Sequence, residues 1–223
     1  MRLLIKYPSR QRPQVFVETF DAYCRNLARP DLCEIIVAAD NDDRIMRGDG
    51  VLSAINSAPC AASIYYGRHR TKVEAINSFV DAATKPWDIV LLASDDMIPC
   101  ERGYDDAIRE AMLEHYPDTM GALWWPDGKV DSINTIQCLG RALYDSMGCI
   151  YHPSYRSLWC DNEATDVGLR DGTLKRMGRT IIRNESPDWG GTHARDQLYR
   201  RNNRLFSIDK ATYERRKAQG FPA

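Results

Sequence analysis

Short apolar runs alternate with segments of helical periodicity through the first part of the chain. The runs are rich in Ile, Val and Leu, as in strands buried on both faces, and the periodic segments would bury one helical face. The pattern predicts strands at residues 3–6, 34–39, 63–66 and 89–93, and helices at residues 15–28, 51–57 and 72–83. Strands that alternate with helices favour an α/β fold with a mostly parallel, doubly wound sheet. Right-handed crossovers would bring the carboxyl ends of these strands to one edge.

The alternation weakens after Pro99. We expect helices at residues 104–115, 161–170 and 195–203, strands at 121–125 and 180–184, and an irregular apolar stretch at 137–149. No internal repeat, low-complexity segment or linker separates the two parts. A chain of 223 residues can bury one substantial core, so a single domain over residues 1–223 is expected rather than two small ones.

Acidic residues follow two of the predicted buried strands. The strand at 89–93 runs into Ser94, Asp95 and Asp96, and the strand at 34–39 ends at Asp40. In open α/β sheets ligands bind outside the carboxyl ends of the strands, so adjacent carboxylates there can hold a hard cation and a phosphate-bearing ligand. Magnesium or manganese would suit such oxygen ligands. The alternative is a solvated turn with a helix cap, since Asp favours both.

The charge is unevenly spread along the chain. The formal net charge is −1, but the segment from residue 195 to the end carries eight Lys or Arg residues against three acids, which leaves −6 on the preceding part. A basic end beside an acidic body favours an anionic partner. The alternative is a solvated helix face, which is the commoner role of a charged run.

Cysteine content and hydropathy indicate the compartment. The seven cysteines are an odd count without a Cys-x-x-Cys pair, which is typical of reduced thiols. No apolar run approaches the roughly 18 residues of a membrane-spanning helix, and no secretory apolar region opens the chain. We therefore expect a soluble, cytoplasmic protein without a membrane partner.

Four segments, in order along the chain, carry a resemblance to a known family. They are YPSRQRP at residues 7–13, GRHRTKVEAIN at 67–77, SDD at 94–96 and EATDVGLR at 163–170. Together they resemble the nucleotide-sugar glycosyltransferases of the A-type (GT-A) fold, closest to family 2 and its viral and bacterial members. In that family the first segment lies against the base and ribose, the third is an Asp-x-Asp metal motif, and the fourth is the helix that holds the general base.

The resemblance implies a site and a reaction. It implies a metal-dependent, inverting transfer from a nucleoside diphosphate sugar, with UDP-sugars favoured, to a hydroxyl acceptor. The donor half would be residues 1–99, and the acceptor and catalytic half residues 100–223. The implied donor-binding residues are Pro8, Ser9, Arg10, Arg12, Asp40, Arg68, Lys72 and Asp95. The implied ligands for Mn²⁺ or Mg²⁺ are Asp95, Asp96 and His193, whose glycine neighbours suit a closing loop.

The chain departs from the family pattern at two positions. Ser94 replaces the first acid of the metal motif, and Ala164 replaces the acid that usually serves as base. The base is then Glu163 or Asp161, either of which at a helix start could take the proton of an acceptor hydroxyl. The other interpretation of these two acids is a capping box at the helix N-terminus.

The acceptor is open at this stage. Trp124 and Trp125 could stack on a sugar or a base, although neighbouring strand residues point to opposite faces, so at least one should be core. The basic C-terminus favours a soluble or nucleic-acid acceptor, and hydroxymethylated pyrimidine in phage DNA, modified in the host cytoplasm, is a specific candidate.

Two other functions compete with glycosyl transfer. A sugar-phosphate nucleotidyltransferase shares the nucleotide-binding architecture, but it would need a glycine-rich first loop, and residues 7–13 contain no glycine. A non-catalytic nucleic-acid-binding protein would use the basic C-terminus and leave the acidic pairs unexplained. The sequence does not indicate the oligomeric state.

Overall fold

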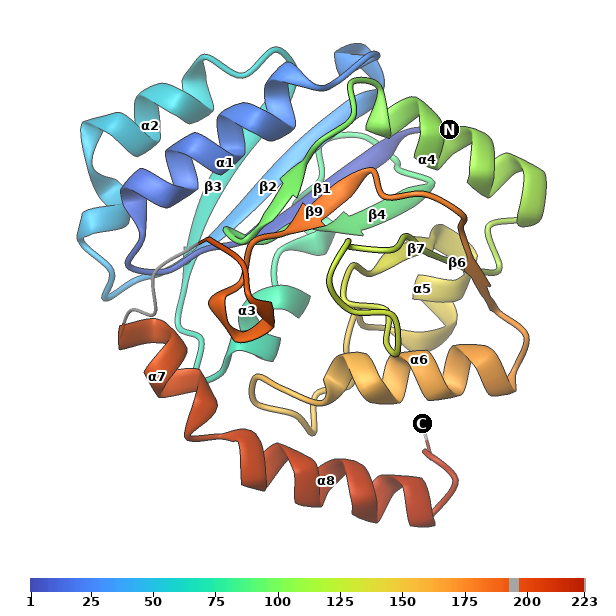
Figure 1. Ribbon diagram of the computed structural model, residues 1–223. Helices are drawn as coiled ribbons and strands as arrows, with labels where there is room; N and C mark the ends of the chain where they lie inside the picture. The colour runs from blue at the N-terminus through green and yellow to red at the C-terminus, as the bar shows by residue number, and fades with distance from the viewer. Residues whose placement is uncertain (193–196, 223) are drawn as a thin grey trace.

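The computed structural model describes residues 1–192 and 197–222. Seven strands form one sheet in the order β3-β2-β1-β4-β7-β6-β8, and two further strands, β5 and β9, pair beside it. Helices pack on both faces of the large sheet (Figure 1). The buried side chains accordingly form two clusters, one on each face. The predicted α/β architecture is confirmed.

The first four strands of the large sheet are parallel. They are β1 (Leu3–Pro8), β2 (Cys33–Asp40), β3 (Ala61–Gly67) and β4 (Ile89–Leu92). Ile5 pairs with Ile35 on one side and Leu91 on the other, and all three are fully buried. Burial on both faces explains why these strands are recognisable as apolar runs.

The strand order reverses beside β1. β2 and β3 lie on one side of β1, and β4 lies on the other. At such a switch point the loops after the two central strands turn in opposite directions and leave a crevice, where open α/β sheets bind ligands. The loop that begins at Ser9 and the turn at Asp95 therefore lie at the two sides of this crevice.

The helices of the first part match the prediction except at one end. They are α1 (Pro13–Arg25), α2 (Asp49–Asn56) and α3 (Lys72–Asn77). The prediction of one helix over residues 72–83 is wrong in length. Phe79 has a φ of 58°, which an α-helix does not allow, and the Asn77 amide binds the backbone of Tyr151 instead.

The second part of the sheet is antiparallel at its junction with the first. β7 (Cys138–Gly140) pairs antiparallel with β4 and with β6 (Ala122–Trp124), and β8 (Leu174–Arg176) runs parallel to β6. The predicted irregular stretch at 137–149 consists of β7 and α5 (Arg141–Met147). β8 was not expected, because its Lys175 and Arg176 are exposed and give no apolar run.

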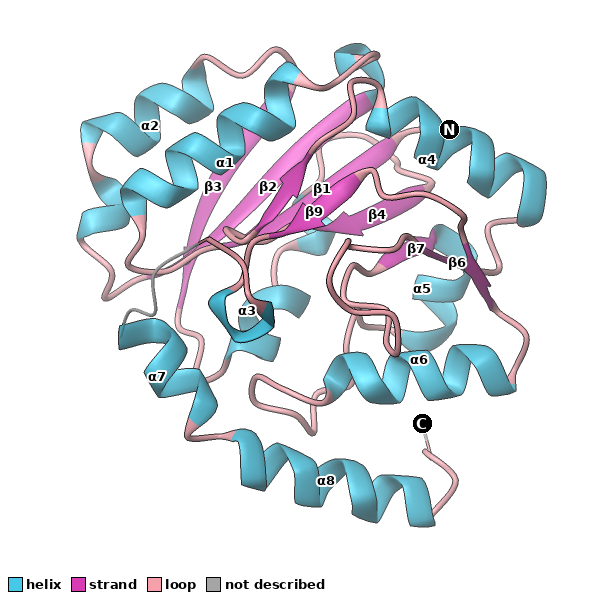
Figure 2. Cartoon of the chain, in the orientation of Figure 1, coloured by secondary structure: helices cyan, strands magenta, loops and turns pink. Residues whose placement is uncertain are grey.

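Four further elements complete this part of the chain. They are α4 (Tyr104–His115), α6 (Cys160–Arg170), and the small sheet of β5 (Met97–Pro99) and β9 (Ile182–Asn184). The small sheet crosses in front of the large one (Figure 2). Within the described ranges, no helix combines the length and apolar character that crossing a bilayer requires.

Two helices close the chain, α7 (Gln197–Asn203) and α8 (Phe206–Ala218). The start of the predicted helix at 195–203 lies outside the described residues. α8 is fastened to α6, since Arg216 pairs with Glu163 at 2.8 Å and Lys217 with Asp166 at 2.8 Å. The basic end of the chain is therefore partly an internal structural element.

A buried carboxylate joins α8 to the loop before α6. Asp209 is fully buried and accepts hydrogen bonds from the backbone N–H groups of residues 156–158 at 2.8–3.0 Å. Charge-assisted bonds of this kind are stronger than neutral ones. α8 therefore fixes the path of the chain into α6.

Replacing Asp209 by Ala should lower the free energy of unfolding by about 3 kcal/mol, because the N–H groups that it binds lose their acceptor. Urea denaturation measures the change. Asp145→Ala is the matched control, since Asp145 forms an exposed pair with Arg141 and should change stability by less than about 0.5 kcal/mol. Equal effects of the two variants would contradict the structural role of Asp209.

Candidate functional site

The turn after β4 holds two acids in different surroundings. Asp95 is 4% exposed, and its Oδ2 accepts a hydrogen bond of 3.0 Å from the Ser9 hydroxyl. Its backbone carbonyl accepts a bond of 2.9 Å from the Thr19 hydroxyl. Its other carboxylate oxygen, Oδ1, is buried without a hydrogen-bond partner in the described part of the chain. The position of Asp95 is thus fixed, and its Oδ1 is buried beside the equally buried Tyr7 hydroxyl.

The two acids also differ in proton affinity. Burial raises the pKa of Asp95 to about 7. Burial acts on Asp96 in the same direction, but the charge of Lys72 and hydrogen bonds from Ser94 and Tyr199 outweigh it and hold the pKa of Asp96 below its ordinary value. Near neutral pH, Asp96 is ionised while Asp95 is partly protonated. A cation at this turn would meet one fixed charge and one that ionises as the cation binds.

The donor set of this turn suits a hard divalent ion. Mg²⁺ is commonly held by one or two carboxylates together with substrate phosphates, and the unpartnered oxygen of Asp95 beside the ionised Asp96 provides this set. Residues 1–192 and 197–222 contain no group of three or more metal-ligating side chains. The predicted ligand His193 lies outside the described residues.

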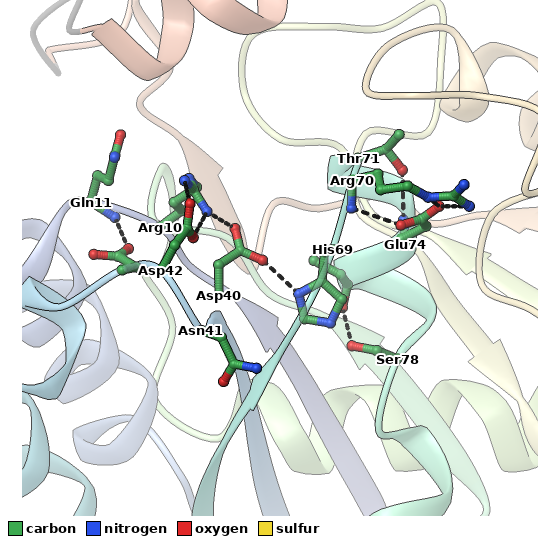
Figure 3. Close-up of polar contacts among 12 residues, drawn as sticks. Arg10, Gln11, Asp40, Asn41, Asp42, His69, Arg70, Thr71, Glu74 and Ser78 are labelled. Atoms are coloured by element: carbon green, nitrogen blue, oxygen red, sulfur yellow. Dashed lines mark hydrogen bonds and ion pairs between the residues drawn. The ribbon is translucent and has the colours of Figure 1, made fainter.

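A second polar network lies at the carboxyl ends of β2 and β3. Asp40 stands between Arg10 and His69: it accepts from the Arg10 guanidinium, and its Oδ1 lies 2.7 Å from His69 Nδ1 (Figure 3). Arg10 also forms two bonds of 2.8 and 2.9 Å with Asp42. Gly67 permits this arrangement, because a Cβ there would come within 2.4 Å of the His69 ring.

The start of α3 brings a lysine to the cavity that Asp40, Asp95 and Asp96 line. The Thr71 hydroxyl caps the helix by accepting from the Glu74 N–H at 3.1 Å, and Glu74 holds Arg70 (Figure 3). Lys72 follows the cap. No described acid pairs with it directly, yet its charge lowers the pKa of Asp96 and partly offsets the rise at Asp161. Lys72 is therefore a cation available to an anionic ligand between these acids.

Helix α7 forms one wall of the cavity. The Tyr199 hydroxyl donates to Asp96 Oδ2 at 2.7 Å, and the Arg12 guanidinium lies 4.3 Å from the centre of the Tyr199 ring. Further α7-side residues line the cavity, namely Leu198, Arg201, Asn202 and Leu205. A ligand at Asp96 would thus meet residues from both ends of the chain.

Most of the predicted donor and metal residues line this one cavity. They are Pro8, Ser9, Arg10, Arg12, Asp40, Lys72, Asp95 and Asp96. Arg68 does not line it and is exposed. His69 and Tyr199 line the cavity but were not expected. The basic run around His69 gave only an ambiguous indication, and nothing near Tyr199 in the sequence indicates a site.

The two candidate bases have different environments. Glu163 is 6% exposed and is held by Arg216 through bonds of 2.8 and 2.9 Å and by the Tyr155 hydroxyl at 2.7 Å. Asp161 accepts only the N–H of Asn162, at 3.0 Å, among the described residues. Burial raises the pKa of Asp161 above its ordinary value. A raised pKa and an unengaged oxygen are what a general base requires.

The two tryptophans predicted to bind an acceptor lie inside the protein. Trp124 is 5% exposed and has the Arg176 guanidinium 4.9 Å from its ring centre, and Trp125 is 2% exposed within the core. Neither lines the cavity at Asp95. Because both rings are buried, neither has an exposed face on which an acceptor could stack.

Comparison with known protein families and with curated proteins found no match. Solved structures do match. A mannosyltransferase from Pyrobaculum calidifontis, in complex with GDP-Man and Mn²⁺, has a TM-score of 0.60 and 15% identity over 80% of this chain and 55% of its own. S. aureus TarS in complex with UDP-GlcNAc has a TM-score of 0.60 and 11% identity over 94% of this chain and 66% of its own.

A third structure represents a different enzyme class. The 4-diphosphocytidyl-2C-methyl-D-erythritol synthase from Anaerococcus prevotii has a TM-score of 0.56 and 12% identity over 84% of this chain and 92% of its own. The present chain thus spans less than two thirds of the two transferase structures and nearly all of the synthase. These likenesses establish the GT-A-type α/β fold that the sequence predicted.

The buried carboxyl of Asp95 makes a prediction about stability and pH. Because its pKa rises from 3.8 to about 7 on folding, the native state binds the proton more tightly. The ligand-free protein should therefore lose stability as the pH rises from 4 towards 7, by up to about 4 kcal/mol. Asp95→Asn should remove most of this loss.

Urea denaturation at several pH values tests this, with the exposed Asp145→Asn as control. The expected result is an Asp95→Asn protein that is more stable than the wild type at pH 8 and similar to it at pH 4. Parallel stability curves for the variant and the wild type would contradict the assignment.

Proposed function

We propose that this protein is a metal-dependent, inverting glycosyltransferase that moves a sugar from a nucleoside diphosphate sugar to a hydroxyl acceptor. The observation that carries the proposal is the Asp95–Asp96 turn at the switch point of the sheet, with one unpartnered buried oxygen and Lys72 nearby. The described neighbours with this fold hold GDP-Man with Mn²⁺ and UDP-GlcNAc. Their shared fold supports the proposed activity.

Asp95 and Asp96 would hold Mn²⁺ or Mg²⁺. Such an ion, when bound, neutralises negative charge that develops on a leaving diphosphate. Lys72 would add a second positive charge at the same place. Tyr199, which now bonds to Asp96 Oδ2, would have to share that oxygen with the ion or release it.

The Arg10–Asp40–His69 network would hold the nucleoside. Its members are fixed by one another, so they can orient a base or ribose with little loss of side-chain freedom on binding. Pro8 and Ser9 line the same cavity, and the Ser9 hydroxyl donates to Asp95. We propose a UDP-sugar as donor on the strength of the family resemblance.

Asp161 is the proposed base. It would accept the proton of the acceptor hydroxyl while that oxygen bonds to the anomeric carbon, and the bond from that carbon to the diphosphate breaks on the opposite face. Glu163 is less suited, since Arg216 and Tyr155 already engage both of its oxygens.

The division into a donor half and an acceptor half remains part of the proposal. The described α7 residues belong to the second half and line the donor cavity, so the two halves would act together. We also propose a cytoplasmic location. All seven cysteines are free thiols, as is usual for proteins of a reducing compartment.

A nucleotidyltransferase is the second candidate, favoured by the near-complete cover of the Anaerococcus prevotii synthase. It would release pyrophosphate from a nucleoside triphosphate, whereas a glycosyltransferase would release a nucleoside diphosphate. The absence of glycine from residues 7–13 counts against it. Identification of the released product separates the two.

Calorimetry with a panel of nucleoside diphosphates tests the donor site. We expect UDP or GDP to bind below millimolar concentration with Mn²⁺ and at least about tenfold more weakly in EDTA, because the ion bridges protein and phosphate. Asp96→Asn should abolish the difference in affinity between Mn²⁺ and EDTA while leaving the fold intact. Binding that is equal with Mn²⁺ and EDTA would contradict the metal role, and no binding at all would contradict the proposal.

Asp161→Asn should lower kcat by on the order of 10²-fold or more and leave donor affinity nearly unchanged. Glu163→Gln is the comparison: it weakens the pair with Arg216 and should lower stability more than it lowers the rate of the folded enzyme. Steady-state kinetics and urea denaturation on both variants give the answer. A normal rate for Asp161→Asn with a strong rate loss for Glu163→Gln would move the base to Glu163.

A further inference from the structure

An aromatic pair stands at the start of α6, directly before the proposed base. Trp159 precedes the helix with a φ of 64°, and its ring centre lies 5.4 Å from that of Phe206, the first residue of α8. Phe206 is 50% exposed. The backbone of residues 156–158 is held by Asp209. The pair is therefore a rigid apolar surface with one ring open to solvent.

One cationic side chain lies beside this pair, and others are close to it in the sequence. The Lys210 ammonium lies 5.8 Å from the Trp159 ring centre. Exposed arginines lie within three residues of Trp159 or Phe206 in the sequence, and others lie along α7. Helix α7 leads directly into α8 (Figure 1). The arginines of these two groups that form no ion pair with an acid in residues 1–192 and 197–222 are Arg156, Arg200, Arg201 and Arg204, of which Arg201 lines the donor cavity. Lys210 pairs with Glu214 at 3.7 Å on the exposed side of α8. We call Arg156, Arg200, Arg204 and Lys210, with Trp159 and Phe206, the α7–α8 surface.

Two other cations of α8 have internal roles. Arg216 is 7% exposed and paired with Glu163, and Lys217 pairs with Asp166. These two residues, which the charge pattern alone would place in a binding surface, are not available to a partner. Among the described α8 cations outside the α7–α8 surface, Arg215 alone is exposed without an ion pair.

The α7–α8 surface adjoins the donor cavity. Leu205, the neighbour of Phe206, lines the cavity that contains Asp95 and Asp96. On the other side, Trp159 is two residues from Asp161. An acceptor on this surface would therefore adjoin both the donor cavity and the start of α6, where the proposed base lies.

We propose that the α7–α8 surface binds a single-stranded nucleic acid, with the base that receives the sugar stacked on Phe206. This inference rests on the proposed function and names its acceptor. Aromatic rings stack on bases, and arginines bind phosphates, so one ligand class uses both features. A neutral saccharide would stack but leave the arginines without a partner. Phe206 and Trp159 take the place of the buried Trp124 and Trp125 as the acceptor platform.

A single strand leaves its nucleobases accessible to the enzyme. Enzymes that modify a base act on single strands or turn the base out of the duplex. The acceptor hydroxyl would belong to a substituent of that base, such as a hydroxymethyl group. Its proton would pass to Asp161, and its oxygen would form the new glycosidic bond as the nucleoside diphosphate leaves.

Fluorescence anisotropy with labelled single strands of about 15 nucleotides, one of DNA and one of RNA, tests the binding. At least one strand should bind, and its affinity should fall at least about tenfold between about 50 and about 200 mM salt. Phe206→Ala should weaken binding about tenfold through lost stacking. Arg200→Glu with Arg204→Glu should weaken it at least about tenfold.

The matched control is Lys85→Glu with Lys175→Glu, which changes the net charge equally at exposed positions outside the α7–α8 surface. It should change the affinity by less than about twofold, because phosphate contacts act at short range. No binding of either strand at low salt would overturn the inference. Equal weakening by the two double variants would also overturn it, since binding would then follow net charge alone.

Donor binding distinguishes this inference from the function on which it rests. A protein that binds UDP or GDP with Mn²⁺ but neither strand keeps the proposed function and refutes the nucleic-acid acceptor. A protein that binds the strands through Phe206 but no nucleoside diphosphate refutes the proposed transfer, and with it the acceptor role of the surface.

Discussion

The site depends on the burial of one ionisable side chain at the point where the sheet changes direction. Asp95 comes at the end of β4, beside the loop after β1, and the packing of the two strands leaves its carboxyl 4% exposed. Burying a carboxylate without full pairing is unfavourable. The Ser9 hydroxyl satisfies one oxygen and the other has no described partner. A cation that binds there would offset the unfavourable free energy of burying the Asp95 carboxylate.

The ends of the chain are joined at this point. Ser9 and Arg12 come from the beginning, and Tyr199 reaches Asp96 from α7. α8 in turn positions the start of α6 through Asp209 and the Glu163–Arg216 pair. The C-terminal helices therefore act as parts of the site, and two of their cations, Arg216 and Lys217, are paired with α6 rather than available to a partner.

The sequence predicts the parallel strands and the acidic turn because both follow from burial. A strand covered on both faces is a continuous apolar run, and Asp95 and Asp96 stand at the end of such a run. β8 is short and carries exposed Lys175 and Arg176, so it has no such pattern. The early end of α3 depends on the left-handed Phe79, which no residue preference indicates.

The parts of the site that the sequence misses depend on long-range contacts. The roles of Tyr199 and His69 come from partners far away in the chain, Asp96 and Asp40. The sequence leaves the choice between Asp161 and Glu163 open. Arg216, 53 residues away from Glu163, engages its carboxylate in the structure and favours Asp161 as the base. Trp124 and Trp125 look available in the sequence because composition does not show which ring the sheet covers.

The central claim is that the Asp95–Asp96 turn holds a divalent ion together with a nucleoside diphosphate. Electron paramagnetic resonance of Mn²⁺ tests it directly, because the signal of free Mn²⁺ falls as the ion binds. The account predicts one bound Mn²⁺ per chain in the presence of UDP or GDP, much weaker binding without the nucleotide, and loss of the bound ion in Asp96→Asn. Equal Mn²⁺ binding by the wild type and Asp96→Asn would contradict it.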